Sequence, residues 1–318
     1  MFPNCRSSHR QHVDYPGIQY GVIWRLRRST SKHHLGAGSR MSRRFVALGA
    51  ALVLLSLTEG AAAATASAEV ELWRLDCGAF VDLNLDGMSD AFDYPDQKKT
   101  LTNSCYLIRH NYDFMLWDTG FRPSDLNAKA DAAPHETIVR QLARIGLATE
   151  KITFVGISHF HFDHTGQASL FPGARLLIGE SDFEVLAHGA QTFGVLSGKS
   201  DIWPWLTETA KVDRVVGDKD IFGDGTVVML ATPGHTTGHH SLLVRLAKRG
   251  NVILSGDAWH FSEQVSHNGV PPENMDRAAT LASMDRILKA AANLNALLII
   301  QHEPADIDKL PKFPLSAK

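Results

Sequence analysis

The stretch Ser158-His159-Phe160-His161-Phe162-Asp163-His164 decides the fold class of this chain. It places three imidazoles and one carboxylate directly after the apolar, strand-like run 152–157. Neutral imidazole and carboxylate are the ligands that Zn²⁺ and other borderline divalent metals take. The first two histidines alternate along an extended segment and so face one way, whereas Asp163 and His164 turn toward a second point. Core packing would leave these polar groups without partners, so the stretch predicts a site for two metals.

One such stretch cannot complete two coordination shells, so further ligands must follow other strands. Three later residues come directly after apolar runs: His235 in Pro233-Gly234-His235, Asp257 in Ser255-Gly256-Asp257, and His302 in Ile300-Gln301-His302. Taken singly, each could be a loop residue without a role. Together with the first stretch they give five histidines and two carboxylates, enough for a two-metal site. His239 and His240 are out of register with these ligands, and we expect them to bond backbone groups.

The 318-residue chain has the composition of a soluble globular protein, with 44% hydrophobic and 21% charged residues. This excludes the disordered, collagen-like and coiled-coil classes. Strand-like runs at 101–108, 152–157 and 226–231 interleave with helical patterns such as 278–294, which predicts an α/β fold. No linker rich in Pro, Gly or Ser divides the halves, so we expect one domain over residues 69–318.

An export signal is expected in front of this domain. Met41-Ser42-Arg43-Arg44 is followed by the apolar run 45–57 and by small residues ending at Ala68, which is the order of a secretory signal peptide over residues 41–68. Residues 1–40 would then be a non-native or disordered basic leader. The apolar run is shorter than the roughly 20 residues that span a bilayer, so we expect no stable membrane anchor. This pattern predicts a periplasmic or secreted protein.

The charge of the chain is divided unevenly. Residues 1–68 hold nine of its 32 basic residues and two of its 34 acidic residues, so residues 69–318 carry a formal net charge of −9. A surface this acidic repels phosphate backbones, which excludes nucleic acid as a partner and disfavours negatively charged substrates. The partner we expect is a small molecule, and a homodimer is left open.

With these ligands identified, the chain resembles the metallo-β-lactamase superfamily over the whole of residues 69–318. The resemblance rests on the His-x-His-x-Asp-His run, the later histidine, the Gly-Asp pair and the last histidine. It implies a four-layered αββα sandwich with a dinuclear zinc site at one edge of the two sheets. Carried over, it gives His159, His161 and His235 to one metal and Asp163, His164 and His302 to the other, with Asp257 bridging both.

Within that superfamily the chain looks most like the N-acyl homoserine lactonases. Asp257 favours lactonases, thiolesterases and phosphodiesterases, because β-lactamases that share the histidine run generally lack it. The stretches 103–108 and 116–120 also resemble the early strands of the lactonases. One departure is clear: those lactonases usually carry a tyrosine three residues after the bridging aspartate, where this chain has His260. An imidazole N–H can donate to an oxyanion, so His260 either keeps that role or signals a different ester or lactone.

The resemblance implies an exported metal-dependent hydrolase that opens the lactone ring of N-acyl homoserine lactones with a metal-bridging hydroxide. Asp163 would return a proton to the leaving alkoxide, and His260 would stabilise the oxyanion. Asp118 either orients His159 or His161 or only forms a turn. Hydrolysis of another ester, a thiolester or a β-lactam is the alternative, and a metal-binding protein without catalysis is a remote one.

Two structural details stay open in the sequence. Cys77 and Cys105 lie in strand-like stretches, and in an oxidising compartment they either pair or remain buried thiols. Aromatic side chains in residues 80–97 and 193–206 either line an acyl-chain pocket or cap the core.

Overall fold

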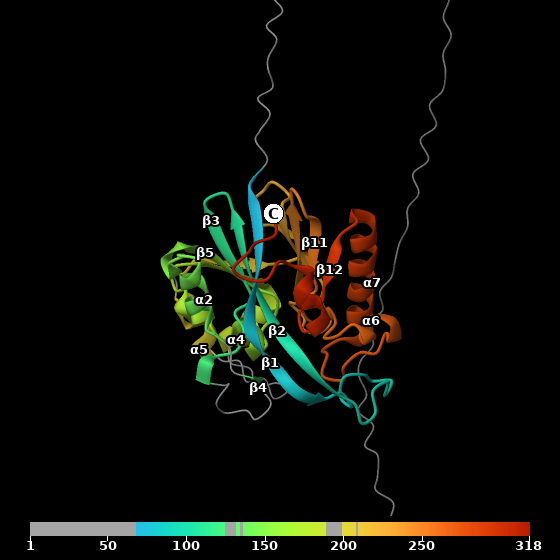
Figure 1. Cartoon of the computed structure of the whole chain (residues 1–318). Helices are drawn as coiled ribbons and strands as arrows, with labels where there is room; N and C mark the ends of the chain where they lie inside the picture. The colour runs from blue at the N-terminus through green and yellow to red at the C-terminus, as the bar shows by residue number, and fades with distance from the viewer. Residues whose placement is uncertain (1–67, 125–131, 134–135, 189–198, 208) are drawn as a thin grey trace, which may run out of the picture. The chain divides into compact units, whose positions relative to one another are not determined.

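Two β-sheets form the centre of the fold (Figure 1). The computed structural model describes residues 68–124, 132–133, 136–188, 199–207 and 209–318. Within these residues, the first sheet has the strand order β4-β1-β2-β3-β5-β6-β7. Its strands are β1 (Val70–Asn84), β2 (Lys98–His110), β3 (Asp113–Trp117), β4 (Ala132–Ala133), β5 (Ile152–Ile157), β6 (Arg175–Gly179) and β7 (Val212–Val215).

The second sheet has the strand order β12-β11-β10-β9-β8. Its strands are β8 (Lys219–Asp220), β9 (Val227–Ala231), β10 (His240–Leu246), β11 (Gly250–Leu254) and β12 (Leu297–Ile299). The α-helices are α2 (Ile138–Arg144), α3 (Phe162–Thr165), α4 (Glu180–His188), α5 (Lys199–Ile202), α6 (Glu263–His267) and α7 (Arg277–Leu294). Short 3-10 turns are η1 (Thr149–Lys151), η2 (Ala168–Leu170), η3 (Trp203–Trp205), η4 (Gly256–Ala258) and η5 (Pro304–Lys309).

Alternating apolar side chains explain why the two sheets stack. Along a strand, successive side chains point to opposite faces of the sheet. In β2, Ile108 enters the cluster between the sheets and Leu107 enters the cluster on the outer face. In β10, Leu242 enters the cluster between the sheets, whereas Leu243 packs in the cluster that contains Ile287 of α7. Each sheet therefore buries apolar side chains on both faces.

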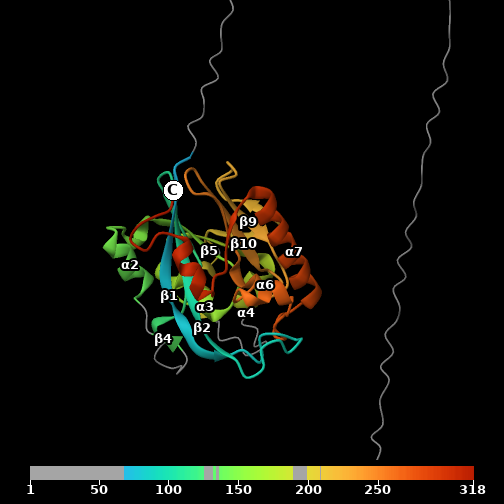
Figure 2. The same ribbon diagram turned by 45° about the vertical axis from the view of Figure 1, so that its right-hand side comes forward.

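Helices cover the two outer faces, which completes four layers. α2 and α4 supply Ile138, Leu142, Phe183 and Leu186 to the outer cluster of the first sheet, and α7 supplies Met284 and Ile287 to that of the second. Figure 2 shows α2 and α7 on opposite sides of the sheets. The predicted αββα sandwich is confirmed. The helix expected at 278–294 begins at Arg277, after Asp276 accepts a hydrogen bond from the Ala279 N–H as N-cap.

The leader and the signal peptide fall almost entirely on residues outside the described ranges. The described residues 68–318 belong to one unit by their contacts. Across the described ranges, no helix has the length and apolar character needed to cross a membrane.

Candidate metal centre

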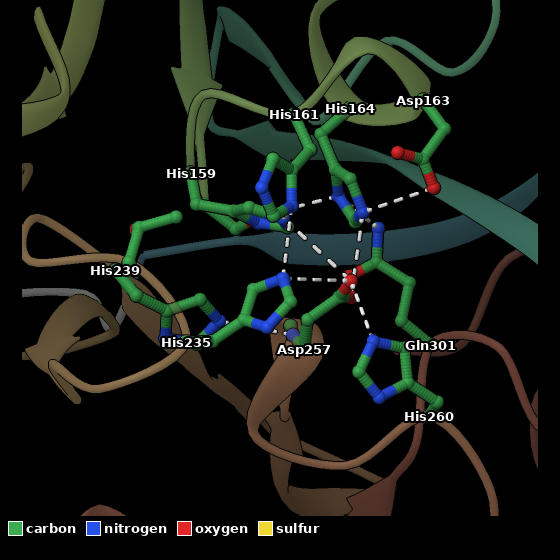
Figure 3. Close-up of polar contacts among 12 residues, drawn as sticks. His159, His161, Asp163, His164, His235, His239, Asp257, His260 and Gln301 are labelled. Carbon is green, nitrogen blue, oxygen red and sulfur yellow. Dashed lines mark hydrogen bonds and ion pairs between the residues drawn. The ribbon is translucent and has the colours of Figure 1, made fainter. Parts of the chain in front are cut away.

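The ends of four strands bring the seven expected ligands together, and six of them are labelled in Figure 3. The run that follows β5 supplies four of them, and the segments after β9, β11 and β12 supply one each. The ligand atoms form two groups, and within each group they lie within 4.8 Å of one another. The first group contains His159, His161, His235 and Asp257, and the second contains Asp163, His164 and His302.

Three imidazole nitrogens of the first group point at one another. His161 Nδ1 lies 2.9 Å from His159 Nε2 and 2.9 Å from His235 Nε2. The alternation of His159 and His161 along the chain gives both rings the same side of the turn, as the sequence predicted. His235 reaches them from the other sheet, after β9.

Asp257 lies between the two groups and turns one carboxylate oxygen to each (Figure 3). Its Oδ1 is 3.3 Å from His164 Nε2 and 3.1 Å from His302 Nε2. Its Oδ2 is 3.6 Å from His159 Nε2 and 3.5 Å from His235 Nε2. If two cations were bound, Asp257 could therefore contribute a ligand to each of them.

The donor set fits divalent metal ions. His164 Nε2, His302 Nε2 and Asp257 Oδ1 are buried and face one another at 3.1–3.3 Å, yet none of them forms a well-aligned hydrogen bond among the described residues. Buried polar atoms without partners are costly, and a cation would pair all three at once. Imidazole nitrogen and carboxylate oxygen are also the donors that zinc takes.

The environments of the two groups differ in charge. Burial lowers the pKa of all three histidines in the first group, that of His161 to about 4. Burial also acts to lower the pKa of His164, but the carboxylates around it, Asp257 first, outweigh burial and raise it. The first group therefore presents neutral imidazoles, whereas the second is dominated by carboxylates.

Asp118 supports the second group, so its expected partners were wrong. Its Oδ2 accepts hydrogen bonds from His164 Nδ1 at 3.0 Å and from Gln301 Nε2 at 2.7 Å, and its Oδ1 accepts one from the Ser158 N–H. The contacts with His159 or His161 that the sequence suggested are not formed, because the turn after β3 directs the carboxylate to His164. Asp118 has a φ of +58°, in the left-handed region that aspartate adopts more readily than most non-glycine residues.

Backbone and amide groups hold the other histidines. His235 Nδ1 donates to Asn274 Oδ1 at 2.8 Å, and His302 Nδ1 donates to the Thr102 carbonyl at 2.8 Å. Each bond fixes the ring so that Nε2 faces the other ligands.

The interpretation of His239 and His240 is confirmed. His239 bonds the Thr232 carbonyl through Nδ1 and accepts the Asp257 N–H at Nε2, and the His240 nitrogens bond the carbonyls of Gly238 and Gly217.

A cavity of about 260 Å³ opens onto the ligands. Its polar end includes His161, Asp163, His235, Asp257, His260 and His302, and its apolar wall is formed by Phe80, Leu83, Met88, Leu101 and Phe162. His260 Nε2 lies 3.4 Å from Asp257 Oδ2, so the imidazole borders the first group. Glu273 also lines the cavity, and it forms no ion pair or side-chain hydrogen bond within the described ranges.

The cavity wall uses one of the two aromatic segments that the sequence offered. Phe80 and Met88 of the first segment line it. In the second segment, residues 193–198 lie outside the described ranges, Trp203 is 59% exposed, and Trp205 packs in the outer core, where its indole donates to the Ala174 carbonyl. These two tryptophans therefore do not line the cavity, since η3 directs Trp205 toward the first sheet.

Cys77 and Cys105 form a disulfide between β1 and β2, with Cα atoms 5.8 Å apart. This settles the question that the sequence left open in favour of pairing. A Cβ on Gly120 would lie 2.6 Å from Cys77 Cβ, so only glycine lets the turn that carries Asp118 pack against the disulfide.

Comparison with known proteins identifies the family. Residues 99–302, which include six of the seven ligands within their interior and His302 at their end, match the metallo-beta-lactamase superfamily. The chain belongs to this superfamily.

Within the metallo-beta-lactamase superfamily, the proteins that it resembles include N-acyl homoserine lactonases. The N-acyl homoserine lactonase AttM of Azorhizobium caulinodans is 29% identical over 184 residues, which cover 56% of this chain and 67% of AttM. A solved N-acyl homoserine lactone hydrolase, with the product N-hexanoyl-L-homoserine at its catalytic metal center, aligns with a TM-score of 0.64 and 23% identity over 77% of this chain and 98% of its own. AidC, a dizinc quorum-quenching lactonase, aligns with a TM-score of 0.57 and 19% identity over 74% and 88%.

The protein is therefore a metal-dependent hydrolase. The two ligand groups support a metal cofactor. The superfamily resemblance stated from the sequence is confirmed.

The residues that hydrogen-bond the ligands and their turns could not be predicted from the sequence. Gln301 stands beside His302, and that adjacency was the only signal for it. Asn274 is 39 residues from His235, and Asp182 is 18 residues from the nearest ligand, His164, so neither belongs to a motif. Contacts of this kind depend on how the loops pack and cannot be found from spacing.

Proposed function

We propose that this protein is an exported dinuclear zinc hydrolase that opens the lactone ring of N-acyl homoserine lactones. The observation that carries the proposal is Asp257, whose two oxygens face the two ligand groups separately. Two of the relatives are lactone hydrolases whose structures hold an acyl homoserine product, which supports this substrate class.

In this proposal His159, His161 and His235 hold one zinc ion, Asp163, His164 and His302 hold the other, and Asp257 is shared. When bound, the pair supplies Lewis acidity toward the substrate carbonyl and makes water nucleophilic near neutral pH. The chain's own part is to fix the ligands through Asp118, Gln301 and Asn274, so that little reorganisation is needed during the reaction.

Two side chains act on the substrate. Water adds to the lactone carbonyl carbon, the ring C–O bond breaks, and the ring oxygen leaves as an alkoxide that needs a proton. Asp163 borders the cavity, and we assign it the transfer of the water proton to that oxygen. His260 stands where its Nε2–H can donate to the carbonyl oxygen as negative charge develops.

The shape and charge of the cavity favour a neutral acyl substrate. Its apolar wall of Phe80, Leu83, Met88 and Leu101 suits an acyl chain, while the ligands at its other end suit the lactone. Glu273 adds a negative charge without a partner among the described residues, which disfavours anionic substrates. This agrees with the net charge of −9 expected from residues 69–318.

The test of activity uses the full chain purified with zinc. Proton release is followed on N-acyl homoserine lactones, with a thiolester, a cephalosporin and an anionic ester in parallel, and with Asp257→Ala as the blank. Fast lactone opening that is lost in the blank supports the proposal. Turnover of only another substrate would keep the hydrolase and discard the lactonase, and absence of all turnover would favour a metal-binding protein without catalysis.

Export is part of the proposal and has its own test. The order of blocks in residues 41–68 supports a signal peptide ahead of the hydrolase domain 69–318, and the Cys77–Cys105 disulfide suits an oxidising compartment. Expression of the full chain in a Gram-negative host, followed by fractionation and N-terminal sequencing, should place the protein in the periplasm with Glu69 first. A cytoplasmic chain that keeps residues 41–68 would contradict export without touching the activity.

A further inference from the structure

A buried carboxylate outside the ligand set connects the two turns that carry the first group. Asp182 of α4 is fully buried, and within the described ranges it forms no ion pair. It accepts three hydrogen bonds: from the Phe160 N–H at 3.1 Å, from Thr236 Oγ1 at 2.7 Å and from the Gly238 N–H at 2.7 Å. Burying a carboxylate that has no cationic partner lowers the stability of the fold, which indicates that this side chain has a function.

All three donors come from the turns that present histidines. Phe160 stands between His159 and His161, and Thr236 directly follows His235. These two turns follow β5 of the first sheet and β9 of the second, so they are not paired as strands of one sheet. The His240 N–H donates to the Ser158 carbonyl at 2.8 Å where the two segments meet, and the carboxylate is a second link, nearer to the ligands.

The packing around this link is close. A Cβ on Gly238 would lie 2.6 Å from Asp182 Oδ1, and a Cβ on Gly179 would lie 2.0 Å from the Gly238 carbonyl oxygen. Glycine at both positions lets the His235 turn approach α4 and the end of β6 closely enough to bond the carboxylate. The turn is thus fixed by both shape and hydrogen bonding.

The second group is supported elsewhere. Its contacts run through Asp118, Gln301 and the Thr102 carbonyl, and the hydrogen bonds that Asp182 accepts come from Phe160, Thr236 and Gly238 rather than from any of its three ligands. A change at Asp182 should therefore act on one group only.

We propose that Asp182 is a positioning residue that holds His159, His161 and His235 in register for one of the two metal ions. This inference rests on the proposed dinuclear zinc site. Supporting contacts of this kind change metal affinity by about 10- to 100-fold when removed. Asparagine is isosteric, but its NH₂ group would face a donor N–H or O–H, so at least one of the three bonds is lost.

The test measures two zinc dissociation constants of the full chain by competition with a chromophoric chelator. Asp182→Asn and Thr236→Val are compared with the parent, and the double variant completes a cycle. His302→Ala identifies the constant that belongs to the second group. Asp213→Asn is the matched control, because Asp213 pairs with Arg175 and Lys219 and bonds neither turn.

We expect Asp182→Asn to raise the constant of the first group by about 10- to 100-fold, with a smaller rise for Thr236→Val and a non-additive double variant. In Asp182→Asn the zinc dissociation constant of the second group should stay within about threefold of the parent value. The melting temperature of the zinc-free variant at pH 8 should not fall below that of the parent. The control Asp213→Asn should leave both dissociation constants unchanged.

An unchanged first constant would overturn the inference. So would an equal rise of both constants, or a lowered melting temperature with parallel loss of both sites, since these describe a structural residue. A parent chain that binds no zinc would instead refute the proposed function, so the two failures can be told apart.

Discussion

The two ligand groups share Asp257 and the same edge of the fold, yet they are held in different ways. Behind the first group the supports are neutral: the Asn274 amide on His235, and the Ser158 hydroxyl, which lies 3.0 Å from His159 Nδ1 and also 3.2 Å from His164 Nδ1 of the second group. Behind the second group stands a carboxylate, Asp118, which bonds the His164 ring itself. Asp182 also serves the first group, but it bonds the backbone and a hydroxyl rather than an imidazole.

This difference separates two ways of preparing a metal ligand. A carboxylate behind an imidazole raises the basicity of the ligand and orients it, so it works through charge as well as geometry. An amide or a hydroxyl mainly fixes the tautomer and the direction of the ring. The second group should therefore depend on charge, and the first on geometry.

The largest effect is expected at the residue that the groups share. Asp257→Ala removes an oxygen from each group, so both zinc affinities should fall and turnover should drop by at least about 1,000-fold, the scale expected when a catalytic centre is dismantled. Zinc content after gel filtration and initial rates on an acyl homoserine lactone check this. A variant that loses only one zinc ion would show that Asp257 belongs to a single group.

The pH dependence of stability tests the support of the first group. Burial raises the pKa of Asp182 to about 7, above the roughly 3.9 of an unfolded aspartate. A raised folded pKa gives stability that is complete below about pH 4 and lost as pH rises through about 7. Asp182→Asn has no such titration, so from pH 5 to pH 8 the zinc-free variant should gain on the order of 2–3 kcal/mol relative to the parent.

Urea unfolding at several pH values measures this gain. Asp213→Asn is a control of opposite sign: burial acts to raise the pKa of Asp213, but bonds from Lys219 and Arg175 outweigh it and lower the pKa. The parent should therefore hold its advantage over Asp213→Asn above pH 4 and lose it as pH falls. A pH-independent difference for Asp182→Asn would show that this carboxylate is not held in an apolar environment.

Charge behind the second group is tested with Asp118→Asn. The change keeps the shape of the side chain and removes its charge, so the zinc constant of the second group should rise by about 10- to 100-fold while that of the first stays nearly constant. Chelator competition with the full chain measures both constants. Equal weakening of the two groups would contradict the comparison, because it would mean that Asp118 acts on the site as a whole.

Much of the site could be predicted because its ligands follow strands. The run 158–164 shows its ligand pattern within seven residues, and the later ligands each follow an apolar run that becomes a strand end. The αββα layers could be predicted only through the resemblance to the superfamily, because strand-like runs do not specify which strands pair. The partner of Asp118 was assigned wrongly for the same reason: the direction of its carboxylate depends on the turn after β3, which local sequence does not fix.

The smallest effect is expected from the neutral support. Asn274→Ala leaves the His235 ring in place but removes the acceptor of its Nδ1–H, so the first zinc constant should rise by about threefold to tenfold, less than for Asp118→Asn in the second group. Thr280→Val is a matched variant, since it removes the hydroxyl that accepts from Asn274 Nδ2 at 3.1 Å and leaves the bond to His235. Its effect should be smaller still. The two zinc dissociation constants decide the comparison. If Asn274→Ala raised that of the first group as much as Asp118→Asn raises that of the second, a neutral support would contribute as much to zinc affinity as a charged one. The distinction between the two groups would then be wrong.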